Sequence, residues 1–155
     1  MASRSGSGSS TKKGVKGLGK RVHVEQDEVG VTTDTDETLT STDMNACSVV
    51  FVWTKTRLYA AHVSIGDLDG LAQKMGKDKK NIKYITVVVR SDGDDEYDEL
   101  KEIIEEELTS KVSIKKEKYA ARLAEDDDPD EIKNASYWIT ATFADKGKYT
   151  VQKKA

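Results

Sequence analysis

The sequence predicts a fold of the α/β (α+β) class, a mixed and mostly antiparallel β-sheet sandwich with two or more flanking helices. Two runs rich in β-branched residues, at 47–53 and 83–90, indicate buried strands. Two segments with apolar residues at helical spacing, at 67–75 and 94–108, alternate with these strands. Strands come first, then alternate with the two helices and end as a hairpin, which is typical of a layered domain.

The first 45 residues differ in composition from the rest of the chain. Residues 1–20 are rich in Ser and Gly and carry five basic side chains and no acidic one, which indicates a flexible basic tail. Because the whole chain of 155 residues has a net charge of −3, the remaining 135 residues carry −8. Residues 21–45 are rich in Thr and Asp, so we expect a partly ordered segment there. A single globular domain is expected at 46–155.

The earliest strand signals are short. Alternating residues at 21–24 predict a short strand. Residues 29–31 predict another brief strand, but most of the segment 25–43 has the composition of a loop. The β-branched and aromatic run at 47–53 predicts a buried strand, and the segment 57–63, which follows a short polar break, predicts its neighbour.

The second half of the chain is expected to end in a hairpin. The helix at 94–108 begins with acidic residues, which suit the positive end of the helix dipole. The segment 112–123 fits a strand by its alternation and a helix by its spacing. Segments 137–143 and 149–151 predict two strands joined through a turn at 145–147.

One cysteine and two histidines restrict the chemistry that the chain can perform. A single cysteine cannot form an internal disulfide, and one cysteine with two histidines cannot build a Cys₄ or Cys₂His₂ zinc site. The segment 67–70 begins like a calcium loop but lacks the later acidic ligands, so we interpret it as the start of a helix. We therefore expect no metal and no cofactor.

The distribution of apolar and charged residues also limits where the protein is expected to be located and which classes of partner it is expected to bind. No apolar run reaches the length that spans a bilayer, and the N-terminal residues lack the apolar core of a secretory signal peptide. We expect a soluble protein, cytoplasmic or exported by a signal-independent route. The acidic body argues against nucleic acid as its main partner, so a protein partner is expected.

The only cysteine and one of the histidines fall on two adjacent predicted strands. If these strands form an antiparallel hairpin that turns at 54–55, Cys47 lies directly opposite His62. Directly opposed residues share a face of the sheet and have Cβ atoms about 4.5–5.5 Å apart. A loop of another length would move the two side chains to a diagonal or to opposite faces. His23 is the other imidazole available to Cys47.

Such a pair suits nucleophilic catalysis. The imidazole can take the proton of the thiol, because the thiolate is the nucleophile, and can later protonate a departing amine. Backbone N–H groups of Cys47 and Ser48 would supply an oxyanion hole. A third group usually orients the imidazole. The candidates are Asp43, Asn45, Asp67 and a backbone carbonyl from residues 22–33.

The same residues also fit a protein without catalytic activity. A lone cysteine at the head of an apolar strand is typical of a small buried hydrophobe. The alternative function is therefore a non-catalytic acidic module that binds a basic protein partner through its loops. This alternative predicts that Cys47 is sealed from solvent and has an ordinary or raised pKa.

Two short segments resemble a known family. The sequence Ala-Cys-Ser at 46–48, followed by an apolar strand and then Tyr-Ala-Ala-His at 59–62, resembles the cytotoxic necrotizing factor-like cysteine deamidases. In that family a Gly-Cys-Thr-type segment begins a strand, and an aromatic-x-x-His segment follows on the neighbouring strand. This sequence departs from that pattern with Ala46 in place of Gly and Ser48 in place of Thr.

The resemblance implies a mixed sheet sandwich with flanking helices, in which Cys47 is the catalytic nucleophile and His62 the base and then the acid. It implies a toxin-like, effector-like hydrolase that acts on a side-chain carboxamide, typically a glutamine of a target protein such as a small GTPase. A backbone carbonyl serves as the third catalytic element in such enzymes, and no cofactor is needed. Deamidation, transglutamination and proteolysis all remain open as the reaction.

Overall fold

The computed structural model describes residues 21–33, 37–44, 47–63, 68–90, 93–119 and 137–153. Within these ranges the strands form one sheet of five strands and one sheet of four. Two α-helices accompany them in the same ranges. The expected class, a mixed α+β fold with flanking helices, is confirmed. The basic tail expected at 1–20 lies outside the described residues.

The five-stranded sheet contains the strands that the β-branched runs predict. Its order is β2-β5-β4-β6-β7. The bounds are β2 Val29–Thr32, β4 Ser48–Thr54, β5 Leu58–Val63, β6 Ile82–Val89 and β7 Ile114–Lys118. All neighbours are antiparallel except β6 and β7, which are parallel. Every residue of β4 and β5 is buried, which explains why these central strands have continuous apolar runs.

The four-stranded sheet joins the beginning of the chain to its end. Its order is β1-β3-β8-β9, with β1 parallel to β3 and the other neighbours antiparallel. The bounds are β1 Arg21–Val24, β3 Thr38–Met44, β8 Tyr137–Thr142 and β9 Thr150–Lys153. The predicted C-terminal hairpin is therefore confirmed as β8 and β9.

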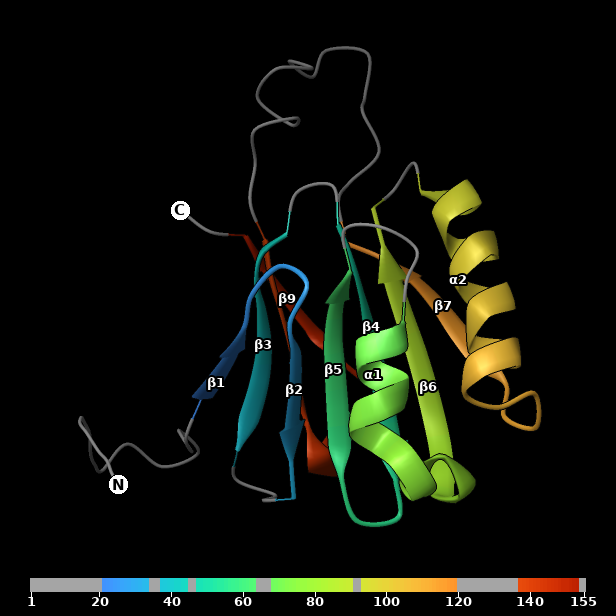
Figure 1. The fold of residues 1–155 in the computed structure, drawn as a ribbon. Helices are drawn as coiled ribbons and strands as arrows, with labels where there is room; N and C mark the ends of the chain where they lie inside the picture. The colour runs from blue at the N-terminus through green and yellow to red at the C-terminus, as the bar shows by residue number, and fades with distance from the viewer. Residues whose placement is uncertain are drawn as a thin grey trace.

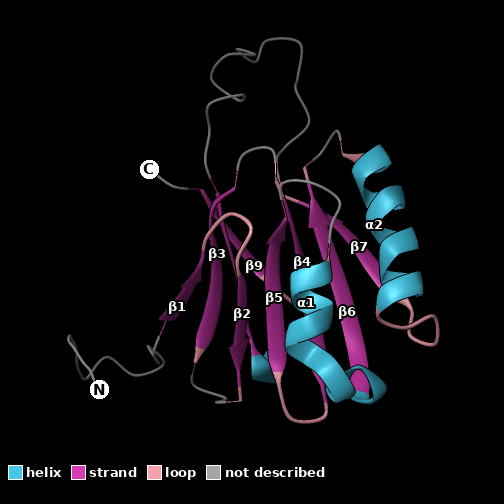
Figure 2. Ribbon diagram, in the orientation of Figure 1, coloured by secondary structure: helices cyan, strands magenta, loops and turns pink. Residues whose placement is uncertain are grey.

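Both helices cover the same face of the five-stranded sheet (Figures 1 and 2). Helix α1 (Asp69–Met75) continues into the 3₁₀ segment η1 (Gly76–Asn81), and α2 is Asp94–Glu107. Side chains from both helices and from β4, β5 and β6 form the core on this face, among them Val50, Val52, Tyr59, Val87, Leu71 and Leu100. None of the helices in the described ranges has the length and apolar character that a membrane span requires.

A second core lies between the two sheets. On β4 the odd-numbered residues Val49, Phe51 and Trp53 face the four-stranded sheet and pack against Leu39 and Ile139. The alternation of a strand sends neighbouring side chains to opposite faces, so β4 contributes to both cores at once. The molecule therefore has three layers, with helices, the five-stranded sheet and the four-stranded sheet in that order.

One element contradicts the sequence interpretation. The segment 25–43 was expected to be mostly loop, but β3 occupies Thr38–Met44 as an interior strand of its sheet. Among the described side chains of β3, Leu39 is the one large apolar core residue, while Thr40 and Ser41 are also fully buried. The Thr40 hydroxyl lies 3.2 Å from that of Thr140 on β8, which satisfies both groups. Because short hydroxyl side chains fill these core positions, the sequence lacks the run of apolar residues that would predict a buried strand here.

The ambiguous segment 112–123 is resolved in part as a strand. Residues Ile114–Lys118 form β7, which pairs in parallel with β6. Its side chains alternate between the two faces, and Lys116 and Lys118 contact Asp94 of α2. Residues 120–123 of the same segment lie outside the described residues.

Candidate active site

The hairpin that carries Cys47 and His62 turns one residue later than expected. Val49, not Cys47, pairs directly with His62 across β4 and β5. The turn therefore lies at 55–56 rather than at 54–55. The prediction that Cys47 lies directly opposite His62 is wrong, because Cys47 is two residues before Val49 and immediately precedes β4.

The side chain of a buried aspartate explains this turn. Thr54 donates a hydrogen bond of 3.0 Å to Asp78 Oδ2 of η1, and its hydroxyl oxygen accepts one of 3.0 Å from the Arg57 backbone N–H. Asp78 also accepts hydrogen bonds from the Tyr59 hydroxyl at 2.9 Å and from Asn81 Nδ2 at 3.0 Å. Thr54 is thus held as the last residue before the turn, and this fixes the register of the hairpin.

The displacement by two positions keeps the two side chains on one face. Residues two apart on a strand point to the same side, so Cys47 shares the face of Val49 and of its partner His62. This face is directed towards the four-stranded sheet, where Cys47 packs against the second core. Diagonal neighbours of this kind lie about 7–8 Å apart between their Cα atoms, and somewhat less between their Cβ atoms.

His62 is held by the turn that joins β1 to β2. Its backbone N–H donates to Glu28 O at 3.1 Å, and its carbonyl accepts from the Asp27 N–H at 2.8 Å. Its ring Nδ1 lies 3.2 Å from the carbonyl oxygen of Val24, and the side chain is buried. A carbonyl only accepts, so Nδ1 carries the proton of the neutral ring and Nε2 carries the lone pair.

A glycine on the next strand leaves room for this arrangement. Gly30 of β2 lies beside Val24, and a Cβ atom at Gly30 would lie 2.6 Å from Val24 Cγ2. That distance is far below a van der Waals contact, so any side chain at Gly30 would displace Val24. The absence of a side chain at position 30 therefore leaves room for the side chain of the residue whose carbonyl contacts His62.

Cys47 immediately precedes β4 and is partly exposed. Burial, followed by the negative charges of Asp27 and Glu96, raises the pKa of its thiol. Its carbonyl accepts a hydrogen bond of 2.8 Å from the Tyr119 hydroxyl. The neighbouring Ser48 points to the other face, where its hydroxyl donates to Glu96 Oε2 at 2.9 Å. The Cys47 side chain is thus a protonated thiol in a negative field.

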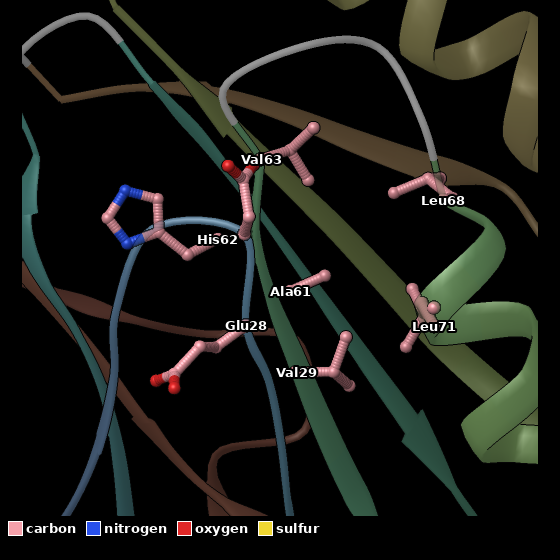
Figure 3. Close-up of a pocket in the computed structure, with 9 residues that line it drawn as sticks. Glu28, Val29, Ala61, His62, Val63, Leu68 and Leu71 are labelled. Carbon is pink, nitrogen blue, oxygen red and sulfur yellow. The ribbon is translucent and has the colours of Figure 1, made fainter.

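A cavity of about 330 Å³ lies on the other face of β5 from the His62 ring. Its apolar side chains are Val29, Ala61, Val63, Leu68 and Leu71. Figure 3 shows the imidazole of His62 pointing away from Leu68 and Leu71. Asp27 and Glu28 of the turn after β1 also line the cavity, and Figure 3 shows the Glu28 carboxylate pointing away from Leu68 and Leu71. His62 also lines the cavity, with its ring directed away from the two leucines of the helix side.

The remaining predicted site residues divide into two groups. Asn45, Asp67 and the side chain of Asp43 lie outside the described residues, so their role as orienting groups stays a prediction. So does the oxyanion hole from the backbone N–H groups of Cys47 and Ser48. His23, the other imidazole, is exposed on β1 and lies edge-on against Trp138, with ring centroids 5.4 Å apart.

Several groups around the pair were not identified individually from the sequence. Val24 acts through its carbonyl oxygen, which every residue has, so only the range 22–33 could be proposed. Asp27 and Glu96 come from the turn after β1 and from α2, and only the fold brings them near Cys47. Among the described residues, no group of three or more His, Cys, Asp or Glu side chains forms a candidate metal site.

Comparison with known proteins gives only weak structural likenesses. No protein-family model matches the chain, and no curated protein matches its sequence. The chain is similar to the crystal structure of the C-terminal domain of CNFy, a cytotoxic necrotizing factor from Yersinia pseudotuberculosis, with a TM-score of 0.38 and 10% identity. The similarity covers 86% of this chain and 62% of that one, so the chain spans less than two thirds of the other structure.

Proposed function

We propose that this chain is a cysteine-dependent amidohydrolase of the glutamine-deamidase type. Cys47 is the nucleophile, His62 the base and then the acid, and the Val24 carbonyl the group that orients the imidazole. The observation that carries the proposal is the contact of 3.2 Å between His62 Nδ1 and Val24 O. It leaves Nε2 as the basic nitrogen of a ring that lies on the same face of the five-stranded sheet as Cys47.

The raised pKa of Cys47 determines when its proton moves. A preformed thiolate–imidazolium pair would be disfavoured by the carboxylates of Asp27 and Glu96. His62 therefore takes the thiol proton during attack on the carboxamide carbon, as a general base. A carbon–sulfur bond forms, the carbon–nitrogen bond breaks, and His62 returns the proton to the departing ammonia. Water then hydrolyses the thioester to a carboxylate and restores the thiol.

The proposed substrate is a side-chain carboxamide of a protein. The resemblance of segments 46–48 and 59–62 to the cysteine deamidases supports a glutamine, on a target such as a small GTPase. Cys47 is partly exposed just before β4, so we expect a protruding side chain to reach it from that end of the sheet. The proposed steps use only side chains, backbone groups and water.

A second candidate function, a non-catalytic acidic module that binds proteins, is favoured by one observation. The pKa of the only thiol is raised rather than lowered, and this is the property expected of an unreactive cysteine. In this function the carboxylates near Cys47 contribute to an acidic binding surface. Cys47 and His62 then have only a packing role.

Three variants of the full chain separate the two functions. Cys47→Ser and His62→Ala remove the two proposed catalytic groups, and His23→Ala is the matched control because it removes the exposed imidazole. Each protein is incubated with purified small GTPases, and intact-mass spectrometry detects the mass change from amide to acid. A deamidase loses this activity in the first two variants and keeps it in the third. Binding without any mass change, retained in all three variants, would contradict the proposal and support the binding module.

A further inference from the structure

An irregularity in β6 brings a lysine and a tyrosine to the surface together. Trp53 of β4 pairs with Tyr84, but the next residue, Thr54, pairs with Ile82, so Lys83 is an extra residue in the ladder. Lys83 and Tyr84 are consequently both exposed, in a strand whose next five residues are buried. Bulges of this kind redirect side chains and are frequent beside functional sites.

Tyr84 is unusual in its exposure. It is 45% exposed and is the one large apolar side chain assigned as exposed among the described residues. Two cavities, of about 320 and 440 Å³, adjoin at this ring, and both are lined by Lys83, Tyr84 and Lys146. Each volume lies in the range of small-molecule sites.

The turn that brings Lys146 and Lys148 beside Tyr84 is fixed to the sheet. The Thr86 hydroxyl donates a hydrogen bond of 2.7 Å to the carbonyl of Gly147. Gly147 has φ +97°, and a Cβ atom on it would lie 3.7 Å from Tyr84 Cδ1, so the turn packs against the ring. The turn therefore has a defined position before any ligand binds.

Besides the exposed Tyr84, this site has several lysine side chains around it. We use the name lysine pocket for the two cavities and their charged residues, Lys55, Lys83, Lys115, Lys146 and Lys148. No acidic side chain of the described residues lines either cavity. Lys115 forms an ion pair of 3.4 Å with Glu117, but within the described ranges no ion pair involves Lys83, Lys146 or Lys148.

The lysines, the exposed Tyr84 and the cavity shape together indicate which chemical groups a ligand of this pocket would carry. Uncompensated ammonium groups attract phosphate, for which lysine is a common binder. An exposed aromatic ring between them offers a surface on which a planar base can stack. The concave and divided shape suits a small molecule better than the broad, flat surface of a protein.

We propose that the lysine pocket binds a nucleoside polyphosphate, with the phosphates near Lys83 and Lys146 and the base against Tyr84. The pocket lies at the end of the five-stranded sheet opposite to Cys47, because Val49 and Trp53 are near opposite ends of β4 and Tyr84 pairs with Trp53. The proposal is thus independent of the proposed amidohydrolase activity.

The test measures binding of ATP that carries a fluorescent N-methylanthraniloyl group, by anisotropy with the full chain at about 0.15 M salt. Saturable binding that unlabelled ATP displaces is expected. The double variant Lys83→Ala/Lys146→Ala should weaken it at least about tenfold. The matched control is Lys74→Ala/Lys101→Ala, which removes two exposed lysines from the helices and should leave binding unchanged. Thermal unfolding of each variant confirms that it is folded.

A third variant separates the base from the phosphates. Tyr84→Ala should weaken the binding of ATP and of the probe, but the dissociation constant of inorganic tripolyphosphate, obtained from displacement after correction for the probe affinity, should be unchanged. Absence of saturable binding, or equal loss in the two double variants, overturns the proposal. An unchanged ATP affinity in Tyr84→Ala also overturns it, since the ligand would then be a free polyphosphate. Displacement by oligothymidine at lower concentration than by ATP would assign the pocket to single-stranded nucleic acid instead.

Discussion

The Nδ1 atom of His62 lies 3.2 Å from the carbonyl oxygen of Val24, and this contact joins the two sheets of the molecule. Val24 ends a strand of the four-stranded sheet, whereas His62 belongs to the five-stranded sheet. The contact therefore orients the imidazole by a backbone group rather than by a carboxylate. Its position depends on how the two sheets pack, and the first prediction follows from that packing.

Gly30→Ala should disturb the His62 ring indirectly, because it moves Val24 but substitutes neither Val24 nor His62. The new methyl group would meet Val24 Cγ2 at 2.6 Å, so Val24 must move. We expect a loss of about 1–3 kcal/mol in the free energy of unfolding, as for overpacked cores. We also expect nitrogen NMR of the ring to show less proton at Nδ1. Gly70→Ala is the control, because a Cβ there meets its nearest neighbour at an ordinary 3.7 Å. An unchanged ring spectrum in Gly30→Ala would show that Val24 does not set the tautomer.

Asp78→Asn should destabilise the protein at neutral pH. Burial raises the pKa of Asp78, but hydrogen bonds from Asn81, Tyr59 and Thr54 outweigh it, and the net pKa lies below the ordinary value. We expect a loss of about 1–3 kcal/mol in urea unfolding, because the amide accepts fewer hydrogen bonds than the carboxylate.

The same substitution should also change how stability depends on pH. A carboxyl group with a lowered pKa in the folded state stabilises the protein above its unfolded pKa of about 3.9, and this is lost as the pH falls through the folded value. The difference in the free energy of unfolding between wild type and Asp78→Asn should therefore become smaller as the pH falls into the acidic range. Asp98→Asn, on the exposed face of α2, is the control. If the difference in unfolding free energy between wild type and Asp78→Asn stays constant from neutral to acidic pH, the charge of the Asp78 carboxylate is not the cause of the destabilisation.

Glu96→Gln should make Cys47 more reactive. The charge of Glu96 is one cause of the raised pKa of the thiol, and glutamine removes the charge while keeping an acceptor for Ser48. We expect iodoacetamide to alkylate Cys47 about two- to threefold faster at neutral pH, with the rate profile shifted to lower pH. Glu99→Gln, exposed on the same helix, should leave the profile unchanged. Equal profiles for the two variants would mean that Glu96 does not act on the thiol.

Asp94→Asn should lower thermal stability slightly at low salt. Hydrogen bonds and the positive charges of Lys116 and Lys118 lower the pKa of Asp94 to about 2. The stabilisation is present above the ordinary pKa of about 3.9 and is lost as the pH falls towards about 2. Because the group is exposed, salt near 1 M should remove the difference in melting temperature from wild type. A difference that persists at that salt would indicate loss of a helix contact rather than of the ion pairs.

The layers of the fold follow from the sequence because they depend on side chains that are close together in the chain. The β-branched runs of β4 and β6 and the periodic apolar residues of α2 each identify their own element. The pattern of apolar residues does not predict β3, because Thr40 and Ser41 occupy core positions that apolar residues usually fill.

The details of the candidate site depend on contacts between distant segments. The hairpin register is fixed by Asp78, which lies 24 residues after Thr54, so the turn sequence alone could not specify it. The carbonyl that orients His62 has no sequence signature. The lysine pocket likewise collects residues from β6, from the turn before β9 and from the end of β4, none of which signals binding alone.

The pairing of β3 with β8 sets a condition on the order of folding. Thr40 and Thr140 are 100 residues apart, and β3 lies between β1 and β8 in its sheet. Contacts between such distant positions form late, because a long loop must close before they contribute stability. During synthesis, β3 lacks one of its two neighbours until the ribosome has released residues 137–142. We therefore expect the five-stranded sheet to fold first and the packing behind His62 to be completed only when the C-terminal hairpin docks.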